Sequence, residues 1–331
     1  MTKIAINGFG RIGRAAFKIA FERQDIEIVA INDLTDNETL AHLLSFDTVY
    51  GRYEKTVEFD DQGLTIDGKR IPVFEEPDPG KLPWEQYEVD VVLECTGIFK
   101  TREKVEPHLQ SGAKKVIMSA PPKDDIKIFC LGCNEETYDR ENDLIISNAS
   151  CTTNCLAPVA KVINDNLGIQ KALMTTIHSY TSTQNIVDGP NKDLRRARAA
   201  AENIIPSTTG AAIAVTRVIP ELEGKFDGMA FRVPTPCVSV VDAVMEVEKA
   251  SSVEEVNDCL IKSSQNELKG ILDCEKKPLV SSDYIANKHS SIVDLEQTMV
   301  MGGNMIKIVA WYDNEWGYSE RLVDMALYLN R

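Results

Sequence analysis

Short apolar runs of strand length recur through the first part of the chain, and each one ends in small or polar residues. They lie at Lys3–Asn7, Ile26–Ile31, Glu88–Cys95 and Lys115–Met118. Between the first two runs, Ala15, Ile19 and Ala20 recur at helical spacing. Strands that alternate with helices in this way are typical of a parallel sheet covered by helices. The pattern therefore predicts an α/β fold here, with Tyr53–Pro72 as an added set of hairpin strands.

The rest of the chain carries further strand patterns and three helix patterns. Strands are predicted at Ala172–Ile177, Gly228–Phe231, Val238–Val247 and Met305–Trp311. Helices are predicted at Leu156–Leu167, Val253–Ser264 and Tyr318–Leu329. Ser252 and Glu255 have the spacing of a capping box before the second helix. Because no linker is visible, we place the domain boundary at Cys151. The predicted domains are residues 1–150 and 151–314, the first completed by a helix within 315–331.

Gly8, Gly10 and Gly13 form a G-x-G-x-x-G motif that follows the first predicted strand and opens the first predicted helix. Such glycines let the chain turn tightly and let a pyrophosphate approach the N-terminus of the helix. Asp33 lies 20 residues after Gly13, where a carboxylate that binds the ribose hydroxyls is expected. The motif therefore predicts a bound dinucleotide. Since a carboxylate repels a 2′-phosphate, it favours NAD over NADP.

Composition narrows the class of protein further. Hydrophobic residues make up 43% and charged residues 26% of the 331 positions, as in ordinary globular proteins. The formal net charge of −15 argues against binding to nucleic acid. No apolar run approaches the roughly 20 residues of a membrane span, and the chain opens directly on a strand, so we expect a cytoplasmic protein. The eight cysteines are expected to be free thiols, and no Cys/His spacing indicates a metal site.

Cys151 is the candidate nucleophile. It lies where the short apolar run Leu144–Ile146 passes, through small polar residues, into the predicted helix. Unpaired backbone N–H groups at a helix start favour a thiolate and can hold an oxyanion. Most cysteines near strands are inert and buried, and Cys155, one turn later, fits that role. The polar residues around Cys151 predict chemistry there instead.

His178 is the candidate base. It ends the predicted strand Ala172–Ile177 just before a polar loop, where active-site residues often lie. Because a neighbouring imidazole is the usual activator of a thiol, we predict that His178 and Cys151 meet in the fold. His42, His108 and His289 lack such a setting, and we assign them no chemistry.

Arginines beside hydroxyl-rich loops predict sites for phosphate groups in an otherwise acidic chain. Arg195–Arg198 is a basic cluster, and Pro206–Ala212 combines hydroxyls with a glycine that opens a helix. Arg232 ends the strand Gly228–Phe231. Two sources of arginine next to such loops favour binding of two phosphate groups.

The stretch Ser147–Cys155 resembles the active-site signature of phosphorylating glyceraldehyde-3-phosphate dehydrogenases, and the resemblance extends from Asn7–Arg14 to Trp311–Ser319. It implies a Rossmann-type domain, then an α+β catalytic domain with a mostly antiparallel sheet. It implies NAD as cofactor, glyceraldehyde 3-phosphate and inorganic phosphate as substrates, and a glycolytic homotetramer. In the implied reaction, Cys151 forms a thiohemiacetal and then a thioester, His178 takes the proton, and phosphate releases 1,3-bisphosphoglycerate.

The catalytic pair is Cys151 and His178. The expected cofactor-binding residues are Gly8, Gly10, Arg11, Ile12, Gly13, Asp33, Thr96, Ser119 and Asn314, the last implied to hold the nicotinamide carboxamide. The resemblance implies phosphate-binding positions at Ser150, Thr152, Thr181, Arg196, Thr209, Gly210 and Arg232. No residue is assigned to a metal.

Three positions depart from the family pattern. Pro77, in Glu76–Asp78, stands where many members have an arginine near the adenine, and Ile213 stands where a lysine is common. Gly189 replaces a larger apolar residue in the segment Ser182–Asn203, which the resemblance places beside a neighbouring subunit's cofactor. The last change loosens a segment that would exclude the extra phosphate of NADP.

Two alternatives remain beside the main hypothesis. A related dehydrogenase of erythrose 4-phosphate would share the Cys/His pair, but such relatives lack the run that is present at Ser207–Ala212. A non-catalytic NAD-binding redox sensor would retain Cys151 as its sensing thiol. The presence of Cys151, His178 and Arg232 together favours an enzyme over the sensor.

Overall fold

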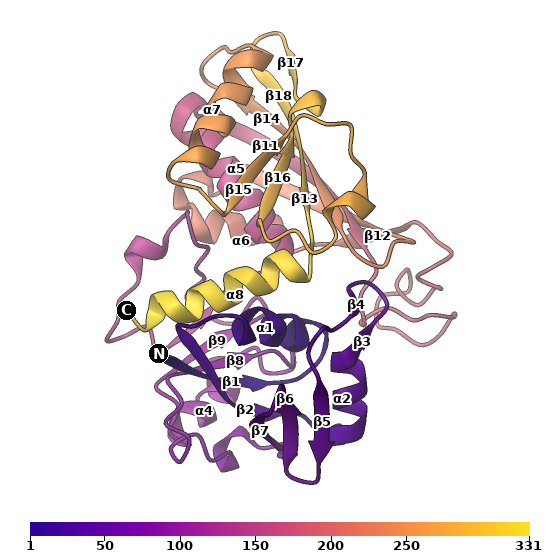
Figure 1. The fold of residues 1–331 in the computed structure, drawn as a ribbon. Coiled ribbons are helices and arrows are strands. Elements are labelled where there is room, and N and C mark those ends of the chain that lie inside the picture. Colours follow the sequence, from indigo (N-terminus) through magenta and orange to yellow (C-terminus); the bar gives the residue numbers. More distant parts are fainter. The chain divides into compact units, whose positions relative to one another are not determined.

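The computed structural model describes all residues, 1–331, and divides them into two compact units. Unit 1 comprises residues 1–129, 136–149 and 319–331. Unit 2 comprises residues 130–135 and 150–318. Unit 1 thus holds both termini of the chain, and unit 2 begins its main segment one residue before Cys151. Figure 1 labels most helices and strands of both units.

Unit 1 is built on an eight-stranded sheet with the order β10-β9-β8-β1-β2-β7-β6-β5. Its strands are β1 (Thr2–Asn7), β2 (Ile26–Asn32), β5 (Val57–Asp60), β6 (Gly63–Ile66), β7 (Lys69–Phe74), β8 (Val91–Glu94), β9 (Lys115–Met118) and β10 (Ile145–Ser147). The pairs from β10 to β7 are parallel, and β7, β6 and β5 continue as antiparallel strands. The predicted α/β sheet and its hairpin strands are confirmed.

The helices of unit 1 follow the glycine-rich turn and cover its sheet. They are α1 (Arg11–Phe21), α2 (Asn37–Ser45), α3 (Arg102–Val105), α4 (Pro107–Gln110) and most of α8 (Trp316–Leu329), and a short β3–β4 ribbon joins Phe46–Asp47 to Gly51–Arg52. Apolar side chains of β8, β9 and α3 pack around the fully buried Trp84. The end of α8 is tied to this unit because Lys115 Nζ donates to the Leu329 carbonyl at 2.5 Å.

Unit 2 contains a second sheet of eight strands, with the order β12-β13-β11-β14-β18-β16-β15 and β17 paired to β18. Its strands are β11 (Ile169–Ser179), β12 (Ile205–Thr208), β13 (Phe226–Val233), β14 (Ser239–Val247), β15 (Leu272–Glu275), β16 (Ser291–Asp294), β17 (Met299–Met301) and β18 (Met305–Tyr312). Five of these pairings are antiparallel, and β11·β13 and β15·β16 are parallel. The mostly antiparallel sheet expected for this part is confirmed.

The three helices of unit 2 pack on its sheet. They are α5 (Cys151–Leu167), α6 (Ala211–Val218) and α7 (Val253–Gln265). The capping box is confirmed, since Ser252 Oγ accepts from Glu255 N–H at 3.2 Å and Glu255 Oε2 accepts from Ser252 N–H at 2.8 Å. The prediction for α5 was five residues short, because the polar start Cys151–Cys155 is already helical. No helix of the structure has both the length and the apolar character needed to cross a membrane.

Candidate active site

The thiol of Cys151 lies at the first residue of α5. Ala149 adopts a left-handed backbone conformation, φ +57°, which turns the chain sharply between β10 and the helix. Ser150 then caps α5, because its Oγ accepts the Thr153 N–H at 3.1 Å. This start places the Cys151 side chain, which is partly exposed, beside the first backbone N–H groups of a 17-residue helix. The local fold thus presents a nucleophile next to possible oxyanion donors.

His178 comes from β11 and lies against that thiol. Its Nε2 is 3.5 Å from Cys151 Sγ, within the distance of a hydrogen bond to sulfur. Its Nδ1 is 2.7 Å from the Ser179 carbonyl oxygen. If Nδ1 carries the proton and donates to that carbonyl, the Nε2 lone pair faces the thiol, which is the tautomer that a base requires. The structure therefore brings the two predicted catalytic side chains together.

Arg232 is paired with His178 by the sheet itself. In the parallel β11·β13 pair, His178 and Arg232 are direct neighbours in register. Arg232 Nη1 donates to the Ser179 carbonyl at 2.9 Å. It also lies 2.7 Å from His178 Nδ1, a contact that is a hydrogen bond only when Nδ1 is unprotonated, so it competes with the bond from Nδ1 to Ser179. The buried Nε of the same guanidinium has no hydrogen-bond partner. Such an unpaired buried donor is costly unless a ligand fills it, so Arg232 suits an anion.

Burial favours the neutral form of both groups in the free site. Burial, and then the charges of Arg232 and Arg196, lower the pKa of His178 to about 3. Burial raises the pKa of the Cys151 thiol, although Arg232 and hydrogen bonds from Thr152 oppose that change. The helix start favours the predicted thiolate, but burial opposes it, so ionisation of the thiol requires His178 to take its proton.

The other predicted phosphate-binding residues lie in two groups in unit 2. Arg196 is held beside the hydroxyl loop, since its Nε donates to Ser207 Oγ at 2.7 Å and its Nη2 to the Thr208 carbonyl at 3.1 Å. Thr209 and Gly210 precede α6, whose N-cap has no side-chain hydrogen bond. These features leave a helix start and a guanidinium side by side for an anion. Thr181 is half-buried, and its hydroxyl oxygen lies 3.0 Å from that of Thr183.

The hydroxyls of Ser150 and Thr152 have internal partners. Ser150 Oγ caps α5, and it also lies 2.8 Å from Thr153 Oγ1. Thr152 is 4% exposed, and its Oγ1 lies 2.9 Å from the Tyr312 hydroxyl, which also contacts Thr176 Oγ1 at 2.9 Å. The Thr152 side chain therefore stabilises the packing of α5 on the sheet, and only its backbone N–H lies at the start of the helix.

Asn314 is fixed by two serines that the sequence analysis did not single out. Its Oδ1 accepts hydrogen bonds from Ser179 Oγ and Ser239 Oγ, both at 2.9 Å, and all three residues are buried. This orientation leaves the Nδ2 group to donate to a ligand carbonyl. Ser179 also supplies the carbonyl that receives His178 Nδ1. One residue thus joins the base to the predicted nicotinamide contact, a link that only the pairing of β11 with β14 and of β14 with β18 reveals.

The glycine-rich turn of unit 1 fits a dinucleotide. Gly8 has φ +92°, and a Cβ there would meet Thr96 N at 2.6 Å, while a Cβ at Gly13 would meet the Gly8 carbonyl oxygen at 2.1 Å. Nothing lies within 4 Å of a Cβ built on Gly10. No side chain caps the N-terminus of α1 at Gly10. The turn is therefore tightly packed inside and open above the helix start, as a bound pyrophosphate requires.

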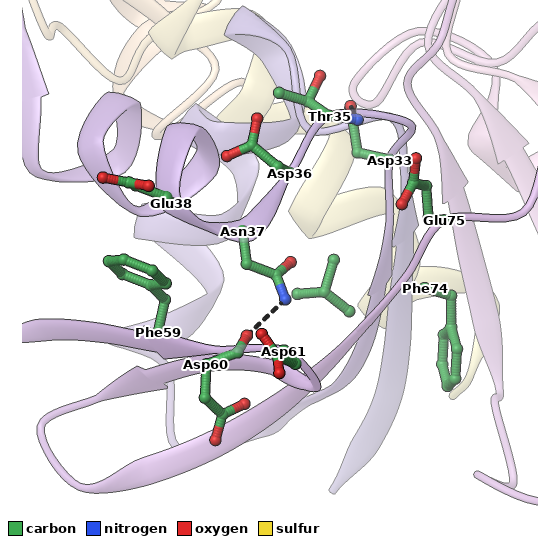
Figure 2. Close-up of a pocket in the computed structure, with 11 residues that line it drawn as sticks. Asp33, Thr35, Asp36, Asn37, Glu38, Phe59, Asp60, Asp61, Phe74 and Glu75 are labelled. Carbon is green, nitrogen blue, oxygen red and sulfur yellow. Dashed lines mark hydrogen bonds between the residues drawn. The ribbon is translucent and has the colours of Figure 1, made fainter.

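Asp33 lies at the carboxyl end of β2, beside this turn. Its Oδ2 accepts the Phe9 N–H at 2.6 Å and its Oδ1 accepts the Thr35 N–H at 3.0 Å, so the carboxylate is held in one orientation. It also lines a pocket of about 350 Å³, shown in Figure 2. The pocket carries six carboxylates: Asp33, Asp36, Glu38, Asp60, Asp61 and Glu75. This concentration of negative charge disfavours a phosphate on the adenosine ribose.

The remaining cofactor candidates occupy the neighbouring loops of unit 1. Arg11, beside Ile12 in the first turn of α1, forms an ion pair with Asp47, and its guanidinium lies 5.4 Å from the centre of the Tyr50 ring. Thr96 and Ser119 follow β8 and β9, and Ser119 N–H donates to the Glu94 carbonyl at 2.9 Å. These loops lie at the carboxyl ends of parallel strands, where open sheets bind ligands.

Comparison with known proteins agrees with this geometry. Residues 2–102 match the family model described as glyceraldehyde 3-phosphate dehydrogenase, NAD binding domain, and residues 150–314 match the model of its C-terminal domain. A glyceraldehyde-3-phosphate dehydrogenase of Geobacillus stearothermophilus is 56% identical over 327 residues. Those of Priestia megaterium and Bacillus subtilis (glyceraldehyde-3-phosphate dehydrogenase 1) are each 54% identical over 327 residues. Each alignment covers 99% of this chain and 98% of the relative.

The match to the NAD binding domain lies within unit 1, and the match to the C-terminal domain lies within unit 2. The NAD binding domain coincides with the glycine-rich turn and Asp33, and the C-terminal domain contains Cys151, His178 and Arg232. The cofactor is NAD. The chain belongs to the glyceraldehyde-3-phosphate dehydrogenase family.

Proposed function

We propose that this protein catalyses the NAD-dependent oxidation and phosphorylation of D-glyceraldehyde 3-phosphate to 1,3-bisphosphoglycerate. The observation that carries the proposal is the contact between Cys151 Sγ and His178 Nε2, 3.5 Å apart beside the first turn of α5. A thiol next to a neutral imidazole, with N–H donors beside it, is the equipment for covalent addition to an aldehyde.

In the first step, Cys151 Sγ forms a bond to the aldehyde carbon while its proton passes to His178 Nε2. Because the pKa of His178 is lowered to about 3, the imidazolium readily returns this proton to the carbonyl oxygen, which gives a neutral thiohemiacetal. Backbone N–H groups of α5 stabilise the negative charge that develops on that oxygen. The Nδ1 contact with Ser179 keeps the ring in place throughout.

In the second step, His178 Nε2 takes the hydroxyl proton as the carbon–hydrogen bond breaks, and Cys151 becomes a thioester. NAD supplies the hydride acceptor when it is bound. Inorganic phosphate then attacks the thioester carbon, the carbon–sulfur bond breaks, and the Cys151 sulfur leaves with a proton returned by His178. Both half-reactions thus use the same base and the same nucleophile.

The two phosphate groups would be held by the arginines and by the helix start before α6. Arg232 offers an unpaired buried Nε, and Arg196 is already oriented by Ser207 and Thr208. We assign Thr181, Thr209 and Gly210 to the same sites, together with Ser150 and the backbone of Thr152. The unpaired Nε makes Arg232 the strongest of these assignments, because a bound phosphate would remove the cost of burying it.

The assembly and the cellular setting belong to the proposal as well. We infer a homotetramer, supported by the exposure of Ile186, Val187 and Leu194 in the irregular segment before β12, which a neighbouring subunit could cover. A cytoplasmic, glycolytic role follows from the proposed reaction.

Gly189, one of the three departures from the family pattern, lies in the same segment. A Cβ at this position would lie 3.1 Å from Asn185 Nδ2, so a larger residue would displace that amide.

One assay tests the reaction and separates its alternatives. Wild-type protein is mixed with NAD and glyceraldehyde 3-phosphate, with and without inorganic phosphate, and NADH is followed by absorbance. We expect repeated turnover only with phosphate, and slower turnover with erythrose 4-phosphate. Faster oxidation of erythrose 4-phosphate would favour the related dehydrogenase, and NAD binding without NADH formation would favour the redox sensor.

A further inference from the structure

A chain of buried polar side chains runs beneath the loops of unit 1 that are expected to bind NAD. Glu94, at the end of β8, and His108, in α4, are 2% and 0% exposed. His108 Nε2 lies 3.2 Å from Glu94 Oε2, and Trp84 Nε1 donates to His108 Nδ1 at 2.9 Å. Because an indole N–H can only donate, Nδ1 is the acceptor, so the proton of His108 lies on Nε2 and points at Glu94.

Glu94 is a buried carboxylate without a cationic partner, and it is satisfied by four donors. On one oxygen these are His108 Nε2 and Asn7 Nδ2. On the other they are Thr96 N–H, at 2.9 Å, and the Thr96 hydroxyl. Every contact requires the carboxyl group to accept, which suits a carboxylate and no other side chain of its size. Apolar residues could fill this space without burying a charge.

The same chain of hydrogen bonds continues to β2 and to the segment after β7. Asn32 Nδ2 donates to Asn7 Oδ1 at 2.7 Å, and Asn32 Oδ1 accepts the Glu76 N–H at 3.0 Å. Asn7, Asn32 and Glu94 are the last residues of β1, β2 and β8. The side chains therefore tie together the strand ends from which the cofactor-binding loops begin.

The contact of Glu94 with Thr96 bears directly on the glycine-rich turn. Thr96 N lies where a Cβ on Gly8 would be only 2.6 Å away, so the two backbones are packed against each other. Gly8 N–H donates to the Asn32 carbonyl at 2.8 Å, and Asp33, the next residue, receives the Phe9 N–H. A shift of Thr96 would therefore move the turn and Asp33 relative to each other.

We propose that Glu94 is a positioning residue for NAD, because its carboxylate fixes Thr96 and Asn7 and thereby the register of the glycine-rich turn with the ribose-binding Asp33. The residue acts on the adenosine diphosphate half of the cofactor and does not touch the reacting atoms. The inference rests on NAD as the cofactor. It adds to the proposed function a determinant of cofactor affinity that lies below the binding surface.

Glu94→Gln tests the inference with little change of volume. The amide of glutamine would direct N–H donors at the N–H and O–H donors of Asn7 or Thr96, so one contact is lost and another becomes repulsive. We expect the Kd for ADP-ribose to rise about tenfold, whereas kcat at saturating NAD stays within about twofold of wild type. Glu103→Gln, a matched change at an exposed position of α3, should leave both values unaltered.

A double-mutant cycle distinguishes positioning from a general structural role. Thr96→Val, at a half-buried position, removes one of the donors to Glu94 and keeps the shape of the side chain. If Glu94 acts through Thr96, the losses of ADP-ribose affinity in the two variants are not additive. If Glu94→Gln does not fold, Thr96→Val alone must weaken ADP-ribose binding for the inference to stand.

Two outcomes would overturn the inference. One is unchanged ADP-ribose affinity in Glu94→Gln or in Thr96→Val. The other is an equal loss of affinity for ADP-ribose and for nicotinamide mononucleotide together with a loss of kcat, as expected from general destabilisation. Failure of wild-type protein to bind NAD would instead contradict the proposed function, so the two failures are distinct.

Discussion

At the scale of single residues, the site depends on burial acting against charge. Cys151 and His178 are each made less ionisable by desolvation, and Arg232 acts in opposite senses on the two. Its positive charge favours the thiolate and disfavours the imidazolium. The pair therefore rests in its neutral form and exchanges a proton only when an aldehyde receives the sulfur.

The buried neutral His178 predicts a loss of stability in acid. The unfolded chain takes up a proton on this residue near pH 6.5, whereas the folded protein takes it up only near pH 3, so stability falls as pH drops below 6.5. In urea unfolding, the drop in free energy of unfolding between pH 7 and pH 5 should be smaller in His178→Gln by about 2 kcal/mol.

The control for this measurement is His42→Gln, which removes a histidine from the exposed face of α2. That variant should retain the wild-type difference between pH 7 and pH 5. If His178→Gln retains it too, the imidazole is not held neutral by the fold, and the account of a neutral imidazole facing the thiol fails.

At the same scale, we propose that Asp33 sets the choice of cofactor. Its carboxylate is held by Phe9 N–H and Thr35 N–H and should receive the ribose hydroxyls. Asp33→Gly should raise the KM for NAD roughly tenfold and lower the KM for NADP, measured as NADH or NADPH formation. Glu103→Gln, which removes a charge from an exposed position of α3 outside this pocket, serves as the control. An unchanged ratio of the two KM values would contradict the ribose assignment.

At the scale of elements, the N-termini of the helices supply several of the proposed binding groups. Four sequence signals precede the N-termini of α1, α5, α6 and α7: the glycine-rich turn, the polar residues before Cys151, the Thr–Gly pair before Ala211, and the capping box. Each of the first three begins beside a proposed anion site. The N-termini of α1 and α6 have no side-chain cap, whereas Ser150 caps α5 and the capping box closes α7.

The capping box gives a prediction that concerns stability alone. Ser252→Ala removes the acceptor for the Glu255 N–H and should cost about 1 kcal/mol in urea unfolding, with kcat and KM unchanged. The hydroxyl of Ser251, one residue earlier, makes contacts of only 3.4 Å, so Ser251→Ala should cost roughly a few tenths of a kcal/mol at most. Equal losses in the two variants would remove the capping box as the cause.

The elements also show what the sequence could not predict. Apolar runs located the long strands and also the short β8, β9 and β10. They missed β12, β15 and β16, which mix apolar with polar residues over four positions, and β17, which has only three residues. Pairing is a tertiary property, so the register that sets Arg232 beside His178 was invisible in the chain. The serines that fix Asn314 were missed for the same reason, and His108 was left without a role because Trp84 and Glu94 are distant in sequence.

At the scale of the whole molecule, the chain separates two tasks. Unit 1 carries the parallel sheet, the glycine-rich turn and the Glu94 network, and unit 2 carries the thiol, the imidazole and both arginines. The glycine-rich turn of unit 1 and the Cys/His pair of unit 2 could be predicted from the sequence. Phosphate binding and thiol chemistry each require one of a few residue types. Cofactor affinity and covalent reactivity should accordingly respond to different substitutions.

The central claim is that Cys151 carries the substrate as a thioester. The most direct measurement is to mix the protein with NAD and glyceraldehyde 3-phosphate without inorganic phosphate, quench in acid, and locate the acyl group by mass spectrometry of peptides. We predict a 3-phosphoglyceryl adduct on Cys151 that disappears when phosphate is added, and no adduct in Cys151→Ser, which still binds NAD. Turnover of Cys151→Ser at the wild-type rate would contradict the account, and so would NADH formation with the acyl group on another residue.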